Sequence, residues 1–155
     1  MKSEHQYTNA RKIMNGKTIL AIIISFNENE DKPSNEISFF TPESFSQQVG
    51  YMARPQGYII SPHIHNPVSR EVLFTKEVLF IKSGKLRVDF YSNKQSYVQS
   101  YIVKQGDIVL LADGGHGFEM IEPSEIIEVK QGPYAGEKDK TRFEGIDHFQ
   151  AIIKH

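Results

Sequence analysis

From residue 49 to residue 130, short runs that combine apolar and polar positions are separated by turn residues. The runs are VGYMAR, YIISPHIH, EVLFIK, KLRVDFY, YVQSYIV, DIVLLA, HGFEMI and EIIEVKQ, with glycine, proline, serine or asparagine between them. Apolar and polar side chains that alternate with a period of two are typical of strands with one buried face. Short strands at even spacing favour a sandwich or barrel over a fold of alternating strands and helices. The pattern predicts an all-β fold with little helix.

The remaining segments predict one domain with extensions at both ends. At 155 residues the chain has the length of a single domain that can bury a core. Residues 1–10 are polar and unpatterned, so we expect a loose N-terminal arm, and residues 27–35 read as a polar loop. Residues 18–26, TILAIIISF, form the most apolar run, and their isoleucines favour a buried strand. We expect the barrel core over about 49–130 and a charged, turn-rich tail over 131–155.

Composition and charge argue against several classes of protein. The 18 basic and 19 acidic side chains nearly cancel, so we expect no basic surface that attracts nucleic acid or anionic lipid. The run at 18–26 is too short for a membrane helix, which needs about 20 residues, and no small-residue cleavage site follows it. Without cysteine the chain has neither disulfides nor thiolate ligands. These features predict a cytoplasmic protein that binds neither nucleic acid nor membrane.

Two histidines and a glutamate carry the candidate chemistry. Side chains two apart on an extended strand share a face, so His63 and His65 are expected to project together. Glu77 begins the run EVLFIK, in which Glu77, Leu79 and Ile81 share a face, and a hairpin would bring this carboxylate towards the histidines. Imidazole nitrogens and a carboxylate oxygen are donors that suit a divalent transition metal.

The spacing around these residues resembles the first motif of the cupin superfamily. That motif is a glycine, five residues, His-x-His, a spacer, a glutamate, six residues and a glycine, matched in order by Gly57, His63, His65, Glu77 and Gly84. The spacer between His65 and Glu77 has eleven residues, which is longer than the family's usual spacer. Glu71 is therefore a rival for the carboxylate position, and we prefer Glu77 because its spacing to Gly84 fits.

A second and poorer match lies in the stretch GDIVLLADGGHGFEM. The second cupin motif runs from a glycine through Pro-x-Gly to a histidine and then an asparagine, and Gly106, Gly114 and His116 occupy the glycine and histidine positions. Ala112 replaces the proline, His116 arrives one residue early, and Met120 stands where asparagine is expected. The two motifs nevertheless occur in the expected order.

The resemblance implies a single-domain cupin, a double-stranded β-helix or jelly-roll barrel, with one site inside it. The ligands of one divalent metal ion, iron, manganese, nickel or zinc, would be His63, His65, Glu77 and His116. Open coordination positions suit a small organic ligand or substrate, as in a metal-dependent dioxygenase or isomerase. The fold also occurs in non-catalytic binding proteins and in sugar-modifying epimerases and isomerases of surface-polysaccharide synthesis, some of which use a histidine base without metal. In that last case the tail would help to hold the substrate.

Each assignment has a structural alternative. His63 and His65 could be surface histidines on an exposed hairpin, and His116 could be a core histidine satisfied by backbone groups. Cupins commonly form homodimers, and the apolar run at residues 19–24 is a candidate for that interface. Charged and polar residues on strands and loops are usually only solvated, which weakens the case for four possible substrate contacts. These four are Arg54, Arg87, Lys82 and Tyr134.

Overall fold

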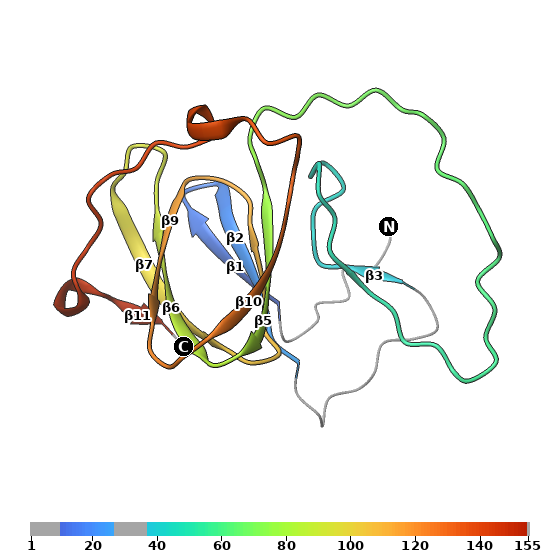
Figure 1. The fold of residues 1–155 in the computed structure, drawn as a ribbon, viewed down its shortest axis with the longest axis horizontal. Coiled ribbons are helices and arrows are strands. Elements are labelled where there is room, and N and C mark those ends of the chain that lie inside the picture. Colours follow the sequence, from blue (N-terminus) through green and yellow to red (C-terminus); the bar gives the residue numbers. More distant parts are fainter. Residues whose placement is uncertain (1–9, 27–36, 155) are drawn as a thin grey trace.

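The computed structural model describes residues 10–26 and 37–154 (Figure 1). The predicted arm at 1–10 and the polar loop at 27–35 lie, except for Ala10, outside the described residues. Within those residues the protein is all β, with eleven strands and two short 3-10 turns at Gly136–Asp139 and His148–Gln150. None of the described residues forms a helix long and apolar enough to cross a membrane. The predicted fold class is confirmed at this level.

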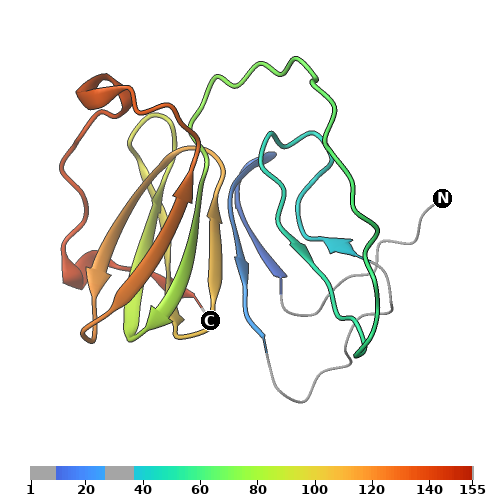
Figure 2. The same cartoon turned by 45° about the vertical axis from the view of Figure 1, so that its right-hand side comes forward.

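Two sheets face each other and hold the core between them (Figure 2). The larger sheet has the order β1-β2-β8-β5-β10, and all its neighbours are antiparallel. Its strands are β1 (Ala10–Asn15), β2 (Thr18–Ile24), β8 (Ile108–Leu111), β5 (Glu77–Ser83) and β10 (Glu125–Lys130). The smaller sheet has the order β11-β7-β6-β9. Its strands are β11 (Ile153–Lys154), β7 (Tyr97–Lys104), β6 (Lys85–Tyr91) and β9 (Gly115–Met120), and a separate pair joins β3 (Ser38–Phe39) to β4 (Gly50–Tyr51).

Strand β6 shows how the alternating pattern builds the core. Leu86, Val88 and Phe90 are buried against Leu79 and Ile81 of β5 in the main cluster between the sheets. The intervening positions of β6 therefore face the outer side of the smaller sheet. The run predicted as a buried strand at 18–26 forms β2 over Thr18–Ile24, and its residues 20–24 are buried because both faces of the sheet are covered there.

The apolar side chains of residues 19–24 pack against other parts of the same chain. Ala21 and Ile23 belong to the main core, whereas Ile22 and Ile24 pack on the opposite face of the sheet. That opposite face is covered by side chains of the segment 40–49, which include Phe40, Phe45 and Val49. This run was a candidate dimer interface, and in the described chain its side chains are covered by the protein itself.

The turn between β5 and β6 explains one of the motif glycines. Gly84 has a φ of 84°, which is in the left-handed region that glycine adopts without strain. A Cβ atom at this position would lie 2.2 Å from the carbonyl oxygen of Pro123. The turn therefore requires glycine, and the Ser83-Gly84 turn predicted from the sequence is confirmed.

Two predicted strands are not formed as expected. Of the run VGYMAR at 49–54 only Gly50–Tyr51 is a strand, and the run YIISPHIH at 58–65 contains none, so the prediction of a strand there is wrong. Residues 52–76 instead form a long exposed segment that leaves the sheets (Figures 1 and 2). A β-strand needs a neighbour to satisfy its backbone groups, and residues 58–65 have no such neighbour among the described residues. Over residues 10–26 and 37–154 the sheets do not close into a barrel.

Candidate functional site

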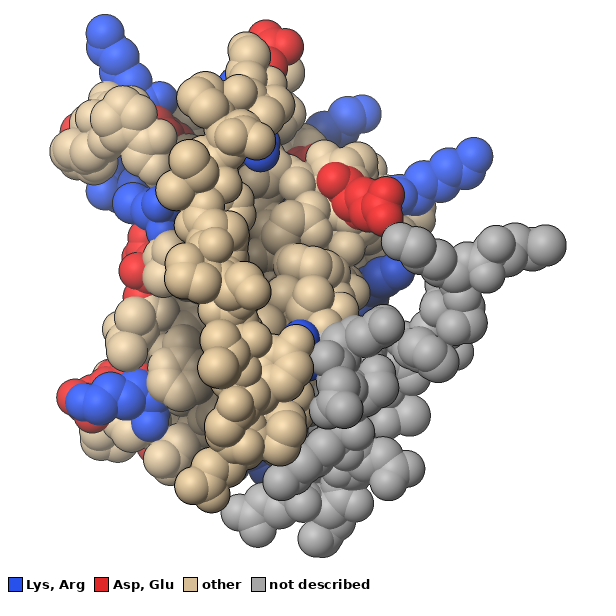
Figure 3. All heavy atoms as spheres, turned by 90° about the vertical axis from the view of Figure 1, so that its right-hand side faces the viewer, with Lys and Arg blue, Asp and Glu red and all other residues tan. Residues whose placement is uncertain are grey.

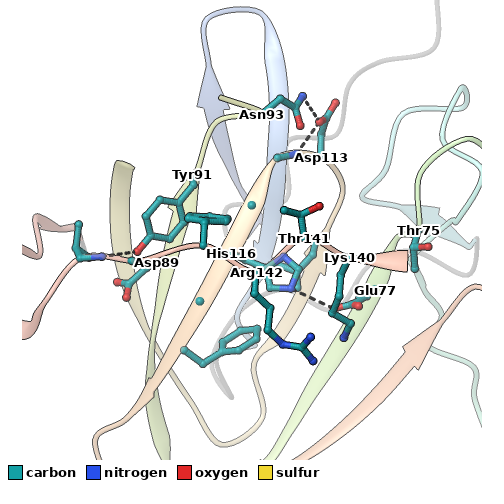
Figure 4. A pocket seen from close by; sticks show the side chains of 18 of the residues that line it. Thr75, Glu77, Asp89, Tyr91, Asn93, Asp113, His116, Lys140, Thr141 and Arg142 are labelled. Carbon is teal, nitrogen blue, oxygen red and sulfur yellow. Dashed lines mark hydrogen bonds and ion pairs between the residues drawn. The ribbon is translucent and has the colours of Figure 1, made fainter. Parts of the chain in front are cut away.

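A cavity of about 810 Å³ lies where the ends of several strands meet the C-terminal tail (Figure 4). Its lining includes Glu77 from β5, Tyr91 from β6, His116 from β9, and Lys140 and Arg142 from the tail. Polar groups from separate parts of the chain therefore converge on one space large enough for a small organic molecule.

Two of the residues that line the cavity, Glu77 and His116, are in contact with each other. Glu77 shares the inner face of β5 with the buried Leu79, and His116 lies directly opposite the buried Phe90 in the β6-β9 ladder. Because opposite residues in a ladder share a face, both side chains point between the sheets. Glu77 Oε2 lies 3.3 Å from His116 Nε2, with 16% of the glutamate side chain and 31% of the histidine side chain exposed.

A hydrogen bond and neighbouring positive charges keep the Glu77 carboxylate ionised. The hydrogen bond with His116 lowers the pKa of Glu77 below 4.5, and it outweighs burial, which acts in the opposite direction. The positive charges of Lys130 and Lys140 contribute in the same sense as His116. At neutral pH Glu77 therefore presents a charged oxygen to the cavity.

The Glu77 and His116 donors have a separation that fits a shared cation. Two nitrogen or oxygen donors bound to one ion at about 2.1 Å lie roughly 3.0 to 3.4 Å apart for octahedral or tetrahedral geometry. The observed 3.3 Å falls in that range. The pair thus fits two of the four positions of the expected ligand set.

The other two predicted ligands are elsewhere. His63 and His65 lie on the exposed segment 52–76 with their rings 5.4 Å apart, and the Nδ1 atom of His63 is 3.0 Å from the carbonyl oxygen of Ser61. The described residues contain no group of three or more histidine, aspartate and glutamate side chains placed to hold a metal. Glu71 also lies on this segment, so of the two rival carboxylates only Glu77 contacts His116.

The tail contributes positive charge that motif matching does not assign. Lys140, Thr141 and Arg142 line the cavity (Figure 4), and the charge of Lys140 acts on Glu77. The Asp139 carboxylate accepts a hydrogen bond of 3.0 Å from the hydroxyl of Thr75, which joins the tail to the residues just before β5. The sequence signal for this part of the site is the cluster of basic residues in KDKTR.

The outer face of the smaller sheet holds a second polar cluster. Arg87 and Asp89 form a two-pronged ion pair, with Nε to Oδ1 at 2.8 Å and Nη2 to Oδ2 at 2.9 Å. Ser100 donates to Asp89, and Glu119 pairs with both Arg87 and His148. The hydrogen bond with Asp89 raises the pKa of Arg87. Because alternation puts Arg87, Asp89 and Tyr91 on one face of β6, the pattern KLRVDFY could have suggested this cluster.

Of the four possible substrate contacts, only Arg87 lines the cavity. Lys82 pairs with Glu125 at 3.0 Å, and Tyr134 has the Lys130 ammonium 6.0 Å from its ring centroid. The Arg54 guanidinium lies 4.9 Å from the Tyr58 ring centroid. Arg87 is itself buried in its ion pairs, so the structure gives each of the four a partner within the chain.

No family model, curated protein or solved structure matches the chain. What the protein does must therefore be inferred from the residues that surround the cavity.

Proposed function

We propose that the protein is a jelly-roll cupin that binds a divalent metal ion and holds a small organic molecule in the cavity. The observation that carries the proposal is the 3.3 Å contact between Glu77 and His116 at a cavity of about 810 Å³. Support also comes from the two facing sheets and from Gly84, whose turn ends the strand that Glu77 begins. These residues occupy motif positions in the order that the resemblance requires.

The donors fit iron, manganese, nickel or zinc, since imidazole and carboxylate together suit these ions. Such an ion would supply a Lewis acid and, if redox-active, a centre for dioxygen chemistry. The protein's own groups would bind and orient the organic ligand. The cavity lining carries both signs of charge, with five carboxylates and the cationic side chains of Arg87, Lys140 and Arg142, so a polar ligand would meet both donors and acceptors.

The test is elemental analysis of protein purified without added metal and without a histidine-rich tag. We expect close to one divalent ion per chain in the wild type and loss of that ion in a Glu77→Gln, His116→Ala variant. The matched control is Glu122→Gln, which alters an exposed carboxylate outside the cavity lining and should keep the metal. A wild type that takes up no divalent metal at neutral pH would contradict the proposal.

The same pair of residues favours a second candidate, a metal-free sugar-modifying epimerase or isomerase. A histidine held by an ionised carboxylate is the arrangement of a general base, because the carboxylate orients the ring and stabilises its protonated form. Under this reading His116 would move the proton and Glu77 would orient it. A metal-free wild type that binds a nucleotide sugar in calorimetry, with binding lost in His116→Ala, would favour this candidate over the first.

A further inference from the structure

The tail carries a histidine that the proposed function does not use. His148 lines the cavity, and its side chain is 63% exposed. Its Nδ1 atom lies 3.1 Å from Oε1 and 3.4 Å from Oε2 of Glu119 on β9. Glu119 and His116 are three residues apart on that strand, so they lie on opposite faces of the smaller sheet. The cavity is therefore lined by two histidine-carboxylate pairs, one on each face of β9.

The hydrogen bonds of His148 indicate which ring nitrogen carries the proton. An ionised carboxylate only accepts, so Nδ1 of His148 donates to Glu119. Nη1 of Arg87 lies farther from Nδ1, at 3.4 Å, and pairs with Glu119 itself. In the neutral ring Nε2 is then an acceptor. Among residues 10–26 and 37–154 this Nε2 has no hydrogen-bond partner, so the pair presents a free acceptor nitrogen.

A buried network holds the Glu119 carboxylate in place. Arg87, whose side chain is 3% exposed, pairs through Nη1 with Oε2 of Glu119. Nε and Nη2 of Arg87 donate to Asp89, which also accepts from Ser100. Arg87 and Asp89 are thus engaged with partners inside the protein, and the acceptor that this cluster leaves for a ligand is Nε2 of His148.

The backbone around His148 is fixed as well. Asp147 caps the short 3-10 turn, and its carboxylate accepts from the amides of Phe149 at 2.8 Å and Gln150 at 3.0 Å. The Gln150 side chain in turn accepts from the Asp147 amide at 2.9 Å. This reciprocal capping satisfies the amides at the start of the turn. The ring is held both by its own turn and by Glu119, so it is oriented before a ligand arrives.

The outer face of β9 has room for a ligand beside Glu119. Gly117 lies two residues before Glu119, and so on the same face of the strand, opposite Asp89 in the β6-β9 ladder. Of the described residues, a Cβ atom at Gly117 would have within 4 Å only the ring of Tyr91, at 3.9 Å. Gly117, Tyr91 and Glu119 all line the cavity. A small molecule in the cavity therefore has access to this face of the strand.

We propose that His148 is a second proton-accepting group at the cavity, positioned by Glu119, and that it takes a proton from a hydroxyl or an acidic C–H group of a small organic ligand. The O–H or C–H bond of the ligand breaks, an N–H bond forms at Nε2, and the electron pair stays on the ligand's oxygen or carbon. Glu119 stabilises the positive charge that the ring then carries. This inference goes beyond the proposed function, because it needs neither the metal nor the pair of Glu77 and His116.

The first measurement locates the proton on the ring of His148 in the wild type. Long-range ¹H–¹⁵N correlation spectra at mildly alkaline pH, where the ring is neutral, should show Nδ1 protonated and Nε2 unprotonated. In Glu119→Gln we expect a mixture of the two tautomers, because an amide donates as well as accepts. A wild-type ring that carries its proton on Nε2 would overturn the proposal, and this outcome does not depend on the folding of a variant.

The second measurement is of proton transfer, with p-nitrophenyl acetate as the probe and a chelator present to remove any metal. Nε2 takes a proton from water as the water oxygen bonds to the ester carbonyl carbon, and p-nitrophenolate leaves. His148→Gln keeps an amide donor for Glu119, so the tail stays anchored, yet hydrolysis should slow at least about threefold, a small share of what a positioned base contributes for a bound substrate. Glu119→Gln should slow hydrolysis as well, with the unfolding midpoint of each variant measured in parallel.

His63 provides the matched comparison for His148. Its Nδ1 lies 3.0 Å from the carbonyl oxygen of Ser61, which leaves Nε2 as the acceptor but gives the ring no carboxylate partner. It belongs to the segment 52–76, on the side of the molecule where uncharged side chains fill most of the middle and charged ones lie near the rim (Figure 3). His63→Gln should therefore slow hydrolysis less than His148→Gln. Equal losses in these two variants, or a wild-type rate in Glu119→Gln, would show that the His148 pair only anchors the tail and would overturn the proposal.

Discussion

The ladder of β6 and β9 carries a polar cluster on each face, and the two clusters are built in opposite ways. On the outer face, Arg87 and Asp89 have side chains only 3% and 7% exposed, and each charged group has several partners. On the inner face, Glu77 and His116 are joined by a single contact and are more exposed, although both clusters line the same cavity.

The number of partners indicates different roles for the two clusters, with the outer one stabilising the fold and the inner one available to a ligand. A buried charge is tolerated only when its hydrogen-bonding groups are satisfied, so the outer cluster is complete and has little capacity left for a ligand. The inner pair lines the cavity and has one contact recorded between its two side chains, so it has more capacity to bind a ligand. Substitutions in the two clusters should therefore act on different measurable quantities.

The largest expected effect is on stability, and it comes from the outer cluster. Asp89→Asn leaves the buried Arg87 without its two-pronged partner and should lower the free energy of unfolding by about 3 kcal/mol. Glu77→Gln removes a partly exposed pair and should cost about 1 kcal/mol or less. Urea unfolding of both variants checks this, and equal losses would mean that the two clusters do not differ in role.

Removing the metal should lower the stability only of proteins in which both Glu77 and His116 are intact. A ligand at one hundred times its dissociation constant stabilises the folded state by about 2.7 kcal/mol, so a chelator should lower wild-type stability by an amount of that order. His116→Ala should be insensitive to the chelator, whereas Glu122→Gln should respond like the wild type. Thermal unfolding with and without chelator makes the measurement, and an unchanged wild type would argue for the metal-free candidate.

A smaller loss of stability is expected when the hydrogen bond that joins the tail to Tyr91 is removed. The Ile146 amide donates to the Tyr91 hydroxyl at 3.0 Å, and Tyr91→Phe should cost about 1 kcal/mol. Burial raises the pKa of Tyr91 above 10.0, so the folded state holds this proton more tightly than the unfolded chain. The associated stability is present below pH 10 and is lost as the pH rises through the raised pKa.

Unfolding measured from pH 8 to pH 11 tests whether burial raises the pKa of Tyr91 in the folded state. The wild type should lose more stability than Tyr91→Phe across that interval, and faster exchange of the Ile146 amide should accompany the substitution at neutral pH. Parallel losses in the two proteins would show that folding does not raise the pKa of Tyr91.

The smallest effect is expected at the cavity mouth. Arg142 pairs with Glu137 at 2.6 Å, but 71% of the arginine side chain and 77% of the glutamate side chain are exposed. Arg142→Ala should change the free energy of unfolding by less than about 0.5 kcal/mol, because exposed pairs are screened by water and salt. A loss comparable to that of Asp89→Asn would place Arg142 among the structural residues.

The alternation of apolar and polar residues along the sequence predicts most of the residues that form the two sheets. The runs EVLFIK, KLRVDFY and YVQSYIV became β5, β6 and β7, because alternation selects a buried face for each strand. Gly84 could be predicted because a tight turn needs a positive φ wherever it occurs. The preference for Glu77 over Glu71 came from spacing, and only Glu77 contacts His116.

By itself, then, the sequence determined the fold class, the strands from β5 to β10, and which side chains share a face along each strand. The tertiary structure alone decided which of those faces is covered and which strand has a neighbour. Arg87 and Asp89 are buried because a tail without periodic pattern returns over them, and residues 58–65 are not a strand because no edge in the described chain pairs with them. Alternation is a property of neighbouring residues, whereas burial and strand pairing depend on segments that are far apart in the chain.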